Sequence, residues 1–437
     1  MDAETPTRRI KISYAPRKAR CPKGGTFGRR KRRRTRMVRS LGFKEIVCLD
    51  IHYGEYAAGC DCCVTFHSCS DGVDLKAKYD HKVRQAVLDR ILQDKLNLSA
   101  VQLSMERDFL LKLSSGYIYG VLEHAIRQFD GQEFRQNVLS EFSGVLCVDE
   151  LHLGKRVVLI TSDPVSDNPV AFAIVSRNDA CHMERFLRNL KNHGFSPKTV
   201  ISDRSPLYPA TIESVWPEAQ HQLCVFHVIA DVNKHVLDAV RETRRSLIPK
   251  SRKKRKRGRP RKRDRARMRK LAAKKLQAEL IFHNRYLLVR KGRDLTSPER
   301  KILDEMCSIS PQLKTLRSFT TDLHVLFALR RTSNEAWKVW RRMRRNGAYL
   351  KIPALKRALE ILSKPAMTKL LCYLSETYLL RSKVRTNNHV ERCNRKIRYL
   401  EKVRYKWRRT KTIVRHILLQ FSNWVQGKQN PSLQQAI

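Results

Sequence analysis

Acidic residues are scarce in this 437-residue chain: Asp and Glu number 41 against 90 Lys and Arg, which leaves a formal net charge of +49. So basic a balance indicates a polyanionic partner, above all nucleic acid, with a membrane-surface protein as the alternative. The sequence has no run of 18 or more apolar residues, which excludes a membrane-spanning helix. Because the N-terminus also lacks an apolar signal segment, we expect an intracellular protein whose 12 cysteines are mostly reduced.

Two dense basic runs divide the chain, and we find no internal repeat of about 20 to 50 residues. RRKRRRTR (29–36) has seven cations in eight positions, which predicts a mobile arm because such charges repel one another. The second run, 252–270, contains 14 Lys or Arg. Short β-rich runs alternate with helical stretches from 142 to 228, and 271–385 has helical spacing. These patterns predict an α/β core with a long helical segment after it.

The core is predicted from its apolar runs and from the acids that end them. We expect strands at 145–148, 156–163, 168–176, 198–203 and 221–228, with helices near 180–193 and 206–214. The first run stops at Asp149 and the fourth ends at Asp203. Three antiparallel strands followed by alternating helices and strands suit a mixed sheet. The two aspartates meet if the first and fourth strands are neighbours.

Paired carboxylates indicate a particular chemistry. Two neighbouring carboxylates repel each other, and they persist when a divalent cation lies between them. Phosphoryl transfer on DNA uses two such ions, one for the attacking oxygen and one for the leaving oxygen. A third acid is expected from a helix that begins near 386–388. Glu391 falls within its first turns and shares a face with Asn394 and Arg395.

A plainer role is open for each of these acids. An aspartate at the end of a strand is often a turn or cap residue, and we interpret Asp163 and Asp167 in that way. The same reading is the alternative for Asp149 and Asp203. A glutamate among arginines on a helix is usually a solvated ion pair, which is the alternative for Glu391.

Four motifs resemble those of the DDE transposases of bacterial insertion sequences, and most closely the ISL-three family: CVDE, ISDRSPLYP, HQLCVFHV and TNNHVERCNRKIR. The resemblance spans about residues 45–425 and implies an RNase H-like α/β mixed sheet with a large all-α insertion. It implies Mg²⁺-dependent cleavage at the transposon ends, followed by attack of the freed 3′-hydroxyl on target DNA. The expected setting is the bacterial cytoplasm, associated with the nucleoid, with a homo-oligomer acting on double-stranded DNA and no membrane.

The resemblance also implies roles for individual residues. Asp149, Asp203 and Glu391 would be the catalytic triad that binds two Mg²⁺ ions. Supporting roles fall to the family's Cys-x-x-His signature and to two residues near the third acid: Cys224, His227, Asn388 and Arg395.

The family's N-terminal zinc ribbon opens with Cys-Pro-x-Cys-Gly, but residues 21–25 read CPKGG here, with Gly24 in the place of the second cysteine. Cys60 and Cys63 have the spacing of a zinc knuckle and are candidate zinc ligands. The missing ligand would come from one of three further cysteines: Cys48, Cys62 or Cys69. Reduced cysteines in a degenerate ribbon without metal are the alternative.

Residues 99–129 have the pattern of a helix-turn-helix. SAVQ (99–102) resembles a capping box, and the second helix, 116–129, buries an apolar face. Tyr117, His124 and Arg127 would then face a DNA groove. A helical hairpin that serves only as a spacer is the alternative.

Two further segments are candidate DNA contacts. KRGRPRKR (256–263) contains the Arg-Gly-Arg-Pro centre of an AT-hook, which suits the narrow minor groove of A·T-rich DNA through Arg257, Arg259 and Arg261. A basic loop without sequence preference and a nuclear-import signal are the alternatives. Trp407 either stacks on an unpaired base or belongs to a core.

These observations predict six parts of the chain: a basic disordered arm (1–40), a zinc-ribbon-like segment (41–78), a helix-turn-helix domain (79–135), the first part of the catalytic core (136–235), a helical insertion with the basic loop 252–270 (236–384), and the C-terminal helices of the core (385–437). A metal-dependent DNA transposase accounts for all of them. A non-catalytic DNA-binding protein, either a decayed transposase or a repressor, is the main alternative. A tyrosine-type recombinase is the third, although its Arg-His-Arg-Tyr set is not evident in the expected order.

Overall fold

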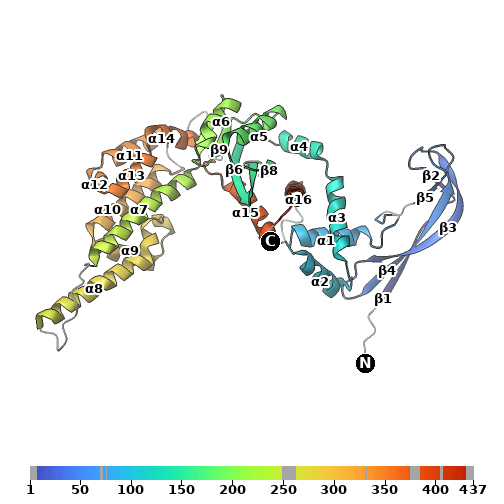
Figure 1. The fold of residues 1–437 in the computed structure, drawn as a ribbon, viewed down its shortest axis with the longest axis horizontal. Helices are drawn as coiled ribbons and strands as arrows, with labels where there is room; N and C mark the ends of the chain where they lie inside the picture. Colours follow the sequence, from blue (N-terminus) through green and yellow to red (C-terminus); the bar gives the residue numbers. More distant parts are fainter. Residues whose placement is uncertain are drawn as a thin grey trace. The chain divides into compact units, whose positions relative to one another are not determined.

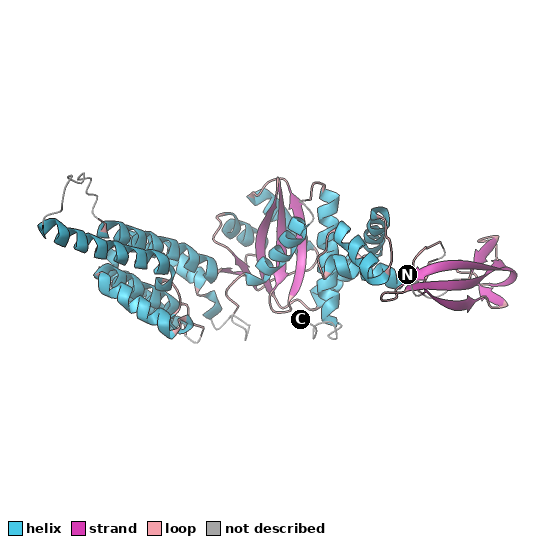
Figure 2. Cartoon of the chain, turned by 90° about the horizontal axis from the view of Figure 1, so that it is seen from below, coloured by secondary structure: helices cyan, strands magenta, loops and turns pink. Residues whose placement is uncertain are grey.

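The computed structural model describes residues 7–68, 72–74, 76–248, 262–329, 332–374, 384–403 and 407–429. The chain forms two compact units, one made of Met1–Gln136 together with Arg395–Ile437 and the other of Asn137–Asn394 (Figure 1). Each unit combines a β-sheet with helices (Figure 2). In the part of the chain that the structure describes, no helix is both long enough and apolar enough to cross a membrane.

The first unit begins with a five-stranded sheet. Its strands are β1 (Thr7–Tyr14), β2 (Lys18–Arg20), β3 (Phe27–Ser40), β4 (Ile46–Ala57) and β5 (Thr65–His67). The order is β1-β4-β3-β2, with β5 also paired to β4. Only β1 runs parallel to β4; the other pairs are antiparallel. Val38, Leu49 and Ile51 form part of a small apolar core on this sheet.

The prediction of a mobile basic arm is wrong for residues 7–40. The run 29–36 lies inside β3, whose main chain pairs with β4 from Arg29 opposite Ala57 to Ser40 opposite Val47. Main-chain pairing does not require neutral side chains, because most of these cations point into water. Glu55 on β4 offsets two of them, since it accepts hydrogen bonds from Arg32 Nε at 2.7 Å and Arg34 Nε at 2.6 Å.

A helical cluster completes the first unit. It contains α1 (His81–Leu92), α2 (Leu98–Phe109), α3 (Ser115–Gln128) and α16 (Thr410–Gln429), and α4 (Gly131–Ser140) follows α3. Leu419 of α16 joins the apolar core of α1, α2 and α3, and Arg415 of α16 makes an ion pair with Glu123. The segment Arg395–Ile437 therefore groups with the N-terminal unit. A single sequence gives no signal for such a long-range docking.

The cap of α2 also differs from the prediction. Asn97, not Ser99, caps the helix by accepting a hydrogen bond from Ala100 N at 2.8 Å. Gln102 is thereby released from the expected capping box, and its Nε2 donates to Leu113 O at 2.7 Å, in the loop between α2 and α3.

The second unit contains a mixed sheet. Its strands are β6 (Val145–Leu153), β7 (Arg156–Asp163), β8 (Asn168–Val175), β9 (Thr199–Ser202) and β10 (Gln220–Leu223). The order is β10-β9-β6-β7-β8, in which β6, β7 and β8 are antiparallel and β6, β9 and β10 parallel. Helix α5 (Ala180–Asn192) connects β8 to β9, and helix α6 (Leu207–Val215) connects β9 to β10. The predicted mixed sheet is confirmed, and its first and fourth strands are neighbours.

A helical insertion follows β10. It runs through α7 (Val225–Leu247), α8 (Lys262–Asn284), α9 (Ser297–Ile309), α10 (Pro311–Leu326), α11 (Ser333–Arg345), α12 (Gly347–Leu350), α13 (Pro353–Ile361) and α14 (Lys364–Leu370), with short 3₁₀ turns at Arg285–Leu288, Gly292–Asp294 and Cys372–Leu374. One apolar core joins these helices. The predicted basic loop 252–270 is shorter than expected, because α8 begins at Lys262; residues 249–261 lie outside the described part.

We expect Glu55→Gln to weaken the N-terminal sheet, because Arg32 and Arg34 lose their only shared anion and repel each other. Limited trypsin digestion with mass spectrometry should show several-fold faster cleavage between Arg29 and Arg36. Asp50→Asn, on the same strand, is the control and should digest like the wild type. Rapid cleavage of the wild-type segment would contradict the paired strand.

Candidate active site

Sheet register places the first two predicted acids side by side. In the parallel pair of β6 and β9, Val145 lies opposite Thr199 and Cys147 opposite Ile201. Asp149 lies two residues beyond Cys147, and Asp203 lies two residues beyond Ile201. Because adjacent strands lie about 4.8 Å apart, the two carboxylates leave the sheet at neighbouring positions. The acid in ISDRSPLYP thus lies beside the acid of β6.

The third acid reaches this edge on α15 (Asn388–Val403). Asn394 Nδ2 donates a hydrogen bond to Asp149 Oδ2 at 2.8 Å. Glu391 lies one helical turn earlier on the same face, since residues three apart are neighbours on a helix surface. Asn388 is the first residue of α15, at the end predicted for it. Arg395, the next residue after Asn394, is exposed.

The electrostatics of Asp149 show that the acids act on one another. Burial raises the pKa of Asp149 to about 7, and the negative charge of Glu150 adds to the shift. Asp203 and Glu391 raise the same pKa further, so both lie within electrostatic reach. A cation at this edge would relieve that repulsion.

Glu150 is a fourth acid that the sequence motifs did not single out. It accepts hydrogen bonds from the hydroxyl of Tyr208 and, at 3.0 Å, from Asn178 Nδ2. Tyr208 is fully buried, and burial together with the charge of Glu150 raises its pKa well above the usual value. Glu150 is the last residue of CVDE, and Tyr208 is part of ISDRSPLYP. The hydrogen bond between them was not predicted because the two residues lie 58 positions apart in the sequence.

The Cys-x-x-His signature bridges two of the acids. Cys224 N donates to Ser202 O at 2.8 Å, directly before Asp203, and the backbone N–H of Asn387 donates to the Cys224 sulfur. His227 Nε2 lies 3.5 Å from Glu391 Oε1. The predicted strand 221–228 is wrong in its second half: β10 ends at Leu223, and α7 begins at Val225 directly after Cys224.

Asp167 ties α15 to the sheet. It stands in the turn between β7 and β8 with a φ of 56°. His389 Nε2 lies 2.8 Å from its Oδ1, and the guanidinium of Arg392 pairs with the same carboxylate. These two residues flank Glu391, so the contact sets the position of the helix. Asp163, by contrast, accepts from Ser143 N and Val165 N, in keeping with its predicted turn role.

The acid cluster has the donors that a hard cation prefers. Glu391 Oε1 is buried and accepts no hydrogen bond from any described residue. Within that part of the chain, three ligand atoms come within 4.8 Å of one another only in a thiol cluster, so at least one pair of carboxylate oxygens of Asp149, Asp203 and Glu391 is farther apart than that.

The thiol cluster lies in the first unit and consists of Cys21, Cys62 and Cys63, whose sulfur atoms lie within 4.8 Å of one another. Cys60 joins it, since its sulfur is 2.6 Å from that of Cys62. Hydrogen bonds from the backbone of Gly24 and Lys23 lower the pKa of Cys21 to about 6. Of the cysteines considered as the missing ligand, Cys62 is in the cluster, Cys48 is buried in β4, and Cys69 lies outside the described residues.

Gly24 lies against these sulfurs. A Cβ built at this position would stand 2.6 Å from the sulfur of Cys60 and 2.9 Å from that of Cys62. The family's second cysteine would therefore project into the cluster. In this chain the sulfur of Cys60 occupies that space.

The predicted DNA-contacting residues differ in their surroundings. Tyr117 is half-buried and packs on Tyr79, with ring centroids 4.6 Å apart. His124 Nε2 lies 2.7 Å from a guanidinium nitrogen of Arg84, whereas Arg127 is exposed.

Trp407 is buried and stacks on His416, with ring centroids 5.2 Å apart. Arg257, Arg259 and Arg261 lie outside the described residues.

Comparison with known proteins identifies the class. The family model DDE_Tnp_ISL3, described as "Transposase", matches residues 146–415, more than half of the chain. The protein therefore belongs to this transposase family and is a DNA transposase. A comparison with curated proteins found no match. Among solved structures, the Drosophila P element transposase strand transfer complex is similar with a TM-score of 0.37 and 13% identity, over 79% of this chain and 91% of that one.

The raised pKa of Asp149 predicts a pH-dependent cost to stability. Between about pH 4 and pH 7 the folded state holds a proton that the unfolded chain releases, so stability falls as the pH rises, by up to roughly 4 kcal/mol. We expect Asp149→Asn to remove this cost and raise the thermal midpoint of metal-free protein near pH 8, but not near pH 4.

Asp163→Asn is the matched control. It should lower the midpoint at both pH values, because this carboxylate accepts hydrogen bonds from Ser143 and Val165. Equal midpoints for wild type and Asp149→Asn near pH 8 would contradict the raised pKa.

Proposed function

We propose that this transposase is a metal-dependent enzyme with an RNase H-like core, in which Asp149, Asp203 and Glu391 form the catalytic triad. The reaction is strand cleavage by water at the transposon end, followed by attack of the freed 3′-hydroxyl on a phosphodiester of the target DNA. The observation that carries the proposal is geometric: the parallel register of β6 and β9 aligns Asp149 with Asp203, and Asn394 of α15, one helical turn after Glu391, donates a hydrogen bond to Asp149. The strand order of the mixed sheet supports it.

Two Mg²⁺ ions are the proposed cofactors, held by Asp149, Asp203 and Glu391. Magnesium takes few protein ligands, and when bound it would activate the attacking oxygen and stabilise the leaving one. The chain's own residues prepare the site. Asn394 orients Asp149 through its 2.8 Å hydrogen bond, and His227 lies beside Glu391.

The other supporting residues act through position. Cys224 holds the end of β9 next to the segment before α15, and burial raises its pKa so that it stays a neutral thiol. Asn388 begins α15, and we propose that the exposed guanidinium of Arg395 contacts DNA phosphate. Such contacts position the duplex without reading its sequence.

The first unit is the proposed end-binding part. Helices α2 and α3 would act as a helix-turn-helix within residues 79–135, with His124 and the exposed Arg127 toward DNA. The AT-hook-like segment with Arg257, Arg259 and Arg261 is proposed as a further DNA contact. Assembly as a homo-oligomer on transposon ends and target DNA, in the nucleoid of a bacterial cytoplasm, completes the proposal.

The thiol cluster within residues 41–78, joined by Cys21, is proposed as a structural zinc site. Structural zinc takes four ligands, and here they would be Cys21, Cys60, Cys62 and Cys63. Backbone hydrogen bonds lower the pKa of Cys21 to about 6, whereas the hydrogen bonds with Cys60 and Cys21 raise that of Cys62 to about 12, so Cys21 is the thiolate and a zinc ion would have to displace the proton of Cys62. The two zinc ligands predicted from the sequence, Cys60 and Cys63, are thus joined by Cys21 and Cys62 as proposed ligands.

Cleavage tests the triad. We expect Asp149→Asn to lower Mg²⁺-dependent cleavage of a duplex carrying the element's own ends by roughly a thousandfold or more, because the variant loses a metal ligand. Affinity for that duplex should stay near normal in a gel-shift assay. EDTA should abolish cleavage by the wild type, and no protein–DNA adduct should form.

Asp238→Asn, on the surface of α7, is the control and should cleave normally. Parallel loss of binding in Asp149→Asn would count against a catalytic role. Cleavage that resists EDTA and leaves a phosphotyrosine would point to a tyrosine recombinase. Binding without cleavage by the wild type would favour a non-catalytic DNA-binding protein.

Metal analysis tests the thiol cluster. Purified wild type should contain about one zinc per chain, and Cys21→Ser and Cys62→Ser should lose most of it, because three thiolates hold zinc less tightly than four. Cys181→Ser, an exposed cysteine on α5, should keep its zinc. A wild type without zinc, or full occupancy in Cys21→Ser, would disprove the site.

A further inference from the structure

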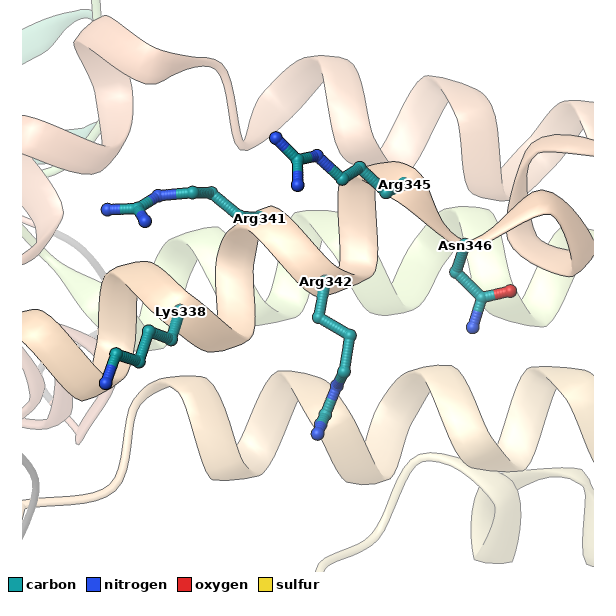
Figure 3. A pocket seen from close by; sticks show the side chains of 5 residues that line it. All are labelled: Lys338, Arg341, Arg342, Arg345 and Asn346. Carbon is teal, nitrogen blue, oxygen red and sulfur yellow. The ribbon is translucent and has the colours of Figure 1, made fainter.

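Helix α11 of the insertion carries a row of cations on its outer face, after the single acid Glu335 in its first turn. Its buried residues, Ala336, Val339 and Met343, form an apolar stripe at helical spacing. The opposite side carries four exposed cations at spacings of three, four and seven: Lys338, Arg341, Arg342 and Arg345. With Asn346 they line an open hollow of about 520 Å³ (Figure 3).

Three of these four cations are unpaired within the described part of the chain. Arg342 extends away from the other guanidinium groups (Figure 3) and pairs with Asp322 of α10 at 2.6 Å. Lys338, Arg341 and Arg345 make no ion pair or hydrogen bond with any residue in the described ranges. Like charges three and four positions apart on a helix repel one another, so this face is destabilising unless an anion covers it.

We propose that Lys338, Arg341 and Arg345 of α11 bind the phosphate backbone of double-stranded DNA. The inference rests on the proposed function, which it deepens by giving the insertion a direct role in holding DNA. The guanidinium group presents a planar fork of donors that fits phosphate oxygens in pairs. No aromatic or apolar side chain lines the hollow, so the contact would not depend on base sequence.

The dimensions favour a polymer over a single small anion. From Lys338 to Arg345 the helix advances about 10 Å, at about 1.5 Å per residue. The hollow is open to solvent along this row, and the side chains diverge instead of converging on one point (Figure 3). Such a row matches successive phosphates of one DNA strand.

Salt dependence of binding tests the inference in the full-length chain. With a labelled DNA duplex of random sequence, Arg341→Gln/Arg345→Gln should weaken binding roughly tenfold and reduce the slope of log affinity against log salt by about 2, near 0.9 per lost phosphate contact. Lys356→Gln/Arg357→Gln removes two exposed cations from α13 and is the matched control; its slope should change by much less.

A charge-retaining variant separates binding from folding. Arg341→Lys/Arg345→Lys should keep most of the salt slope, and the thermal midpoint of the glutamine variant should equal or exceed that of the wild type, because repulsion is relieved. Equal slopes for the glutamine variant and the α13 control would overturn the inference. Cleavage assays on Asp149→Asn report on the proposed catalysis independently, so a failure of either proposal is recognisable by itself.

Discussion

The burial of Asp149 next to other carboxylates, in the middle of β6, is the constraint on which the rest of the second unit depends. Burial and the neighbouring Glu150 raise the pKa of Asp149 to about 7, and Asp203 and Glu391 raise it further. Groups that repel one another stay together only when the surrounding structure holds each of them in place. The unit supplies such restraints from several elements, and in its metal-free state it bears their electrostatic cost.

One restraint lies within the sheet, and the others join the sheet to α15 or to the segment before it. The parallel register of β6 and β9 aligns Asp149 with Asp203. Cys224 connects the end of β9 to the segment that leads into α15, and the turn residue Asp167 contacts both His389 and Arg392. The long helical insertion can therefore separate Glu391 from the other acids in sequence without separating it in space.

The cations of this chain fall into two groups: some pair with its own acids, and the others do not. Several of the few acids already serve cations of the protein itself, as Glu55 does for Arg32 and Arg34 and Asp322 does for Arg342. The cations that remain, among them Arg341 and Arg345, are available to a polyanion. The same scarcity makes the acid cluster of the catalytic unit distinctive, because it lies in a protein with 49 excess positive charges.

Local pattern in the sequence was enough to predict the mixed sheet and the helical insertion, because apolar periodicity is a short-range signal. The predicted end of the first strand at Asp149 is wrong, because β6 continues to Leu153. Only tertiary structure decided the pairing of the basic run 29–36 with β4, the docking of α16 on α1 and α3, and the contact of Asp167 with α15. It also gathered Cys21 with Cys62 and Cys63. These features join residues tens to hundreds of positions apart, and their free energy comes from packing and hydrogen bonds that no local window contains.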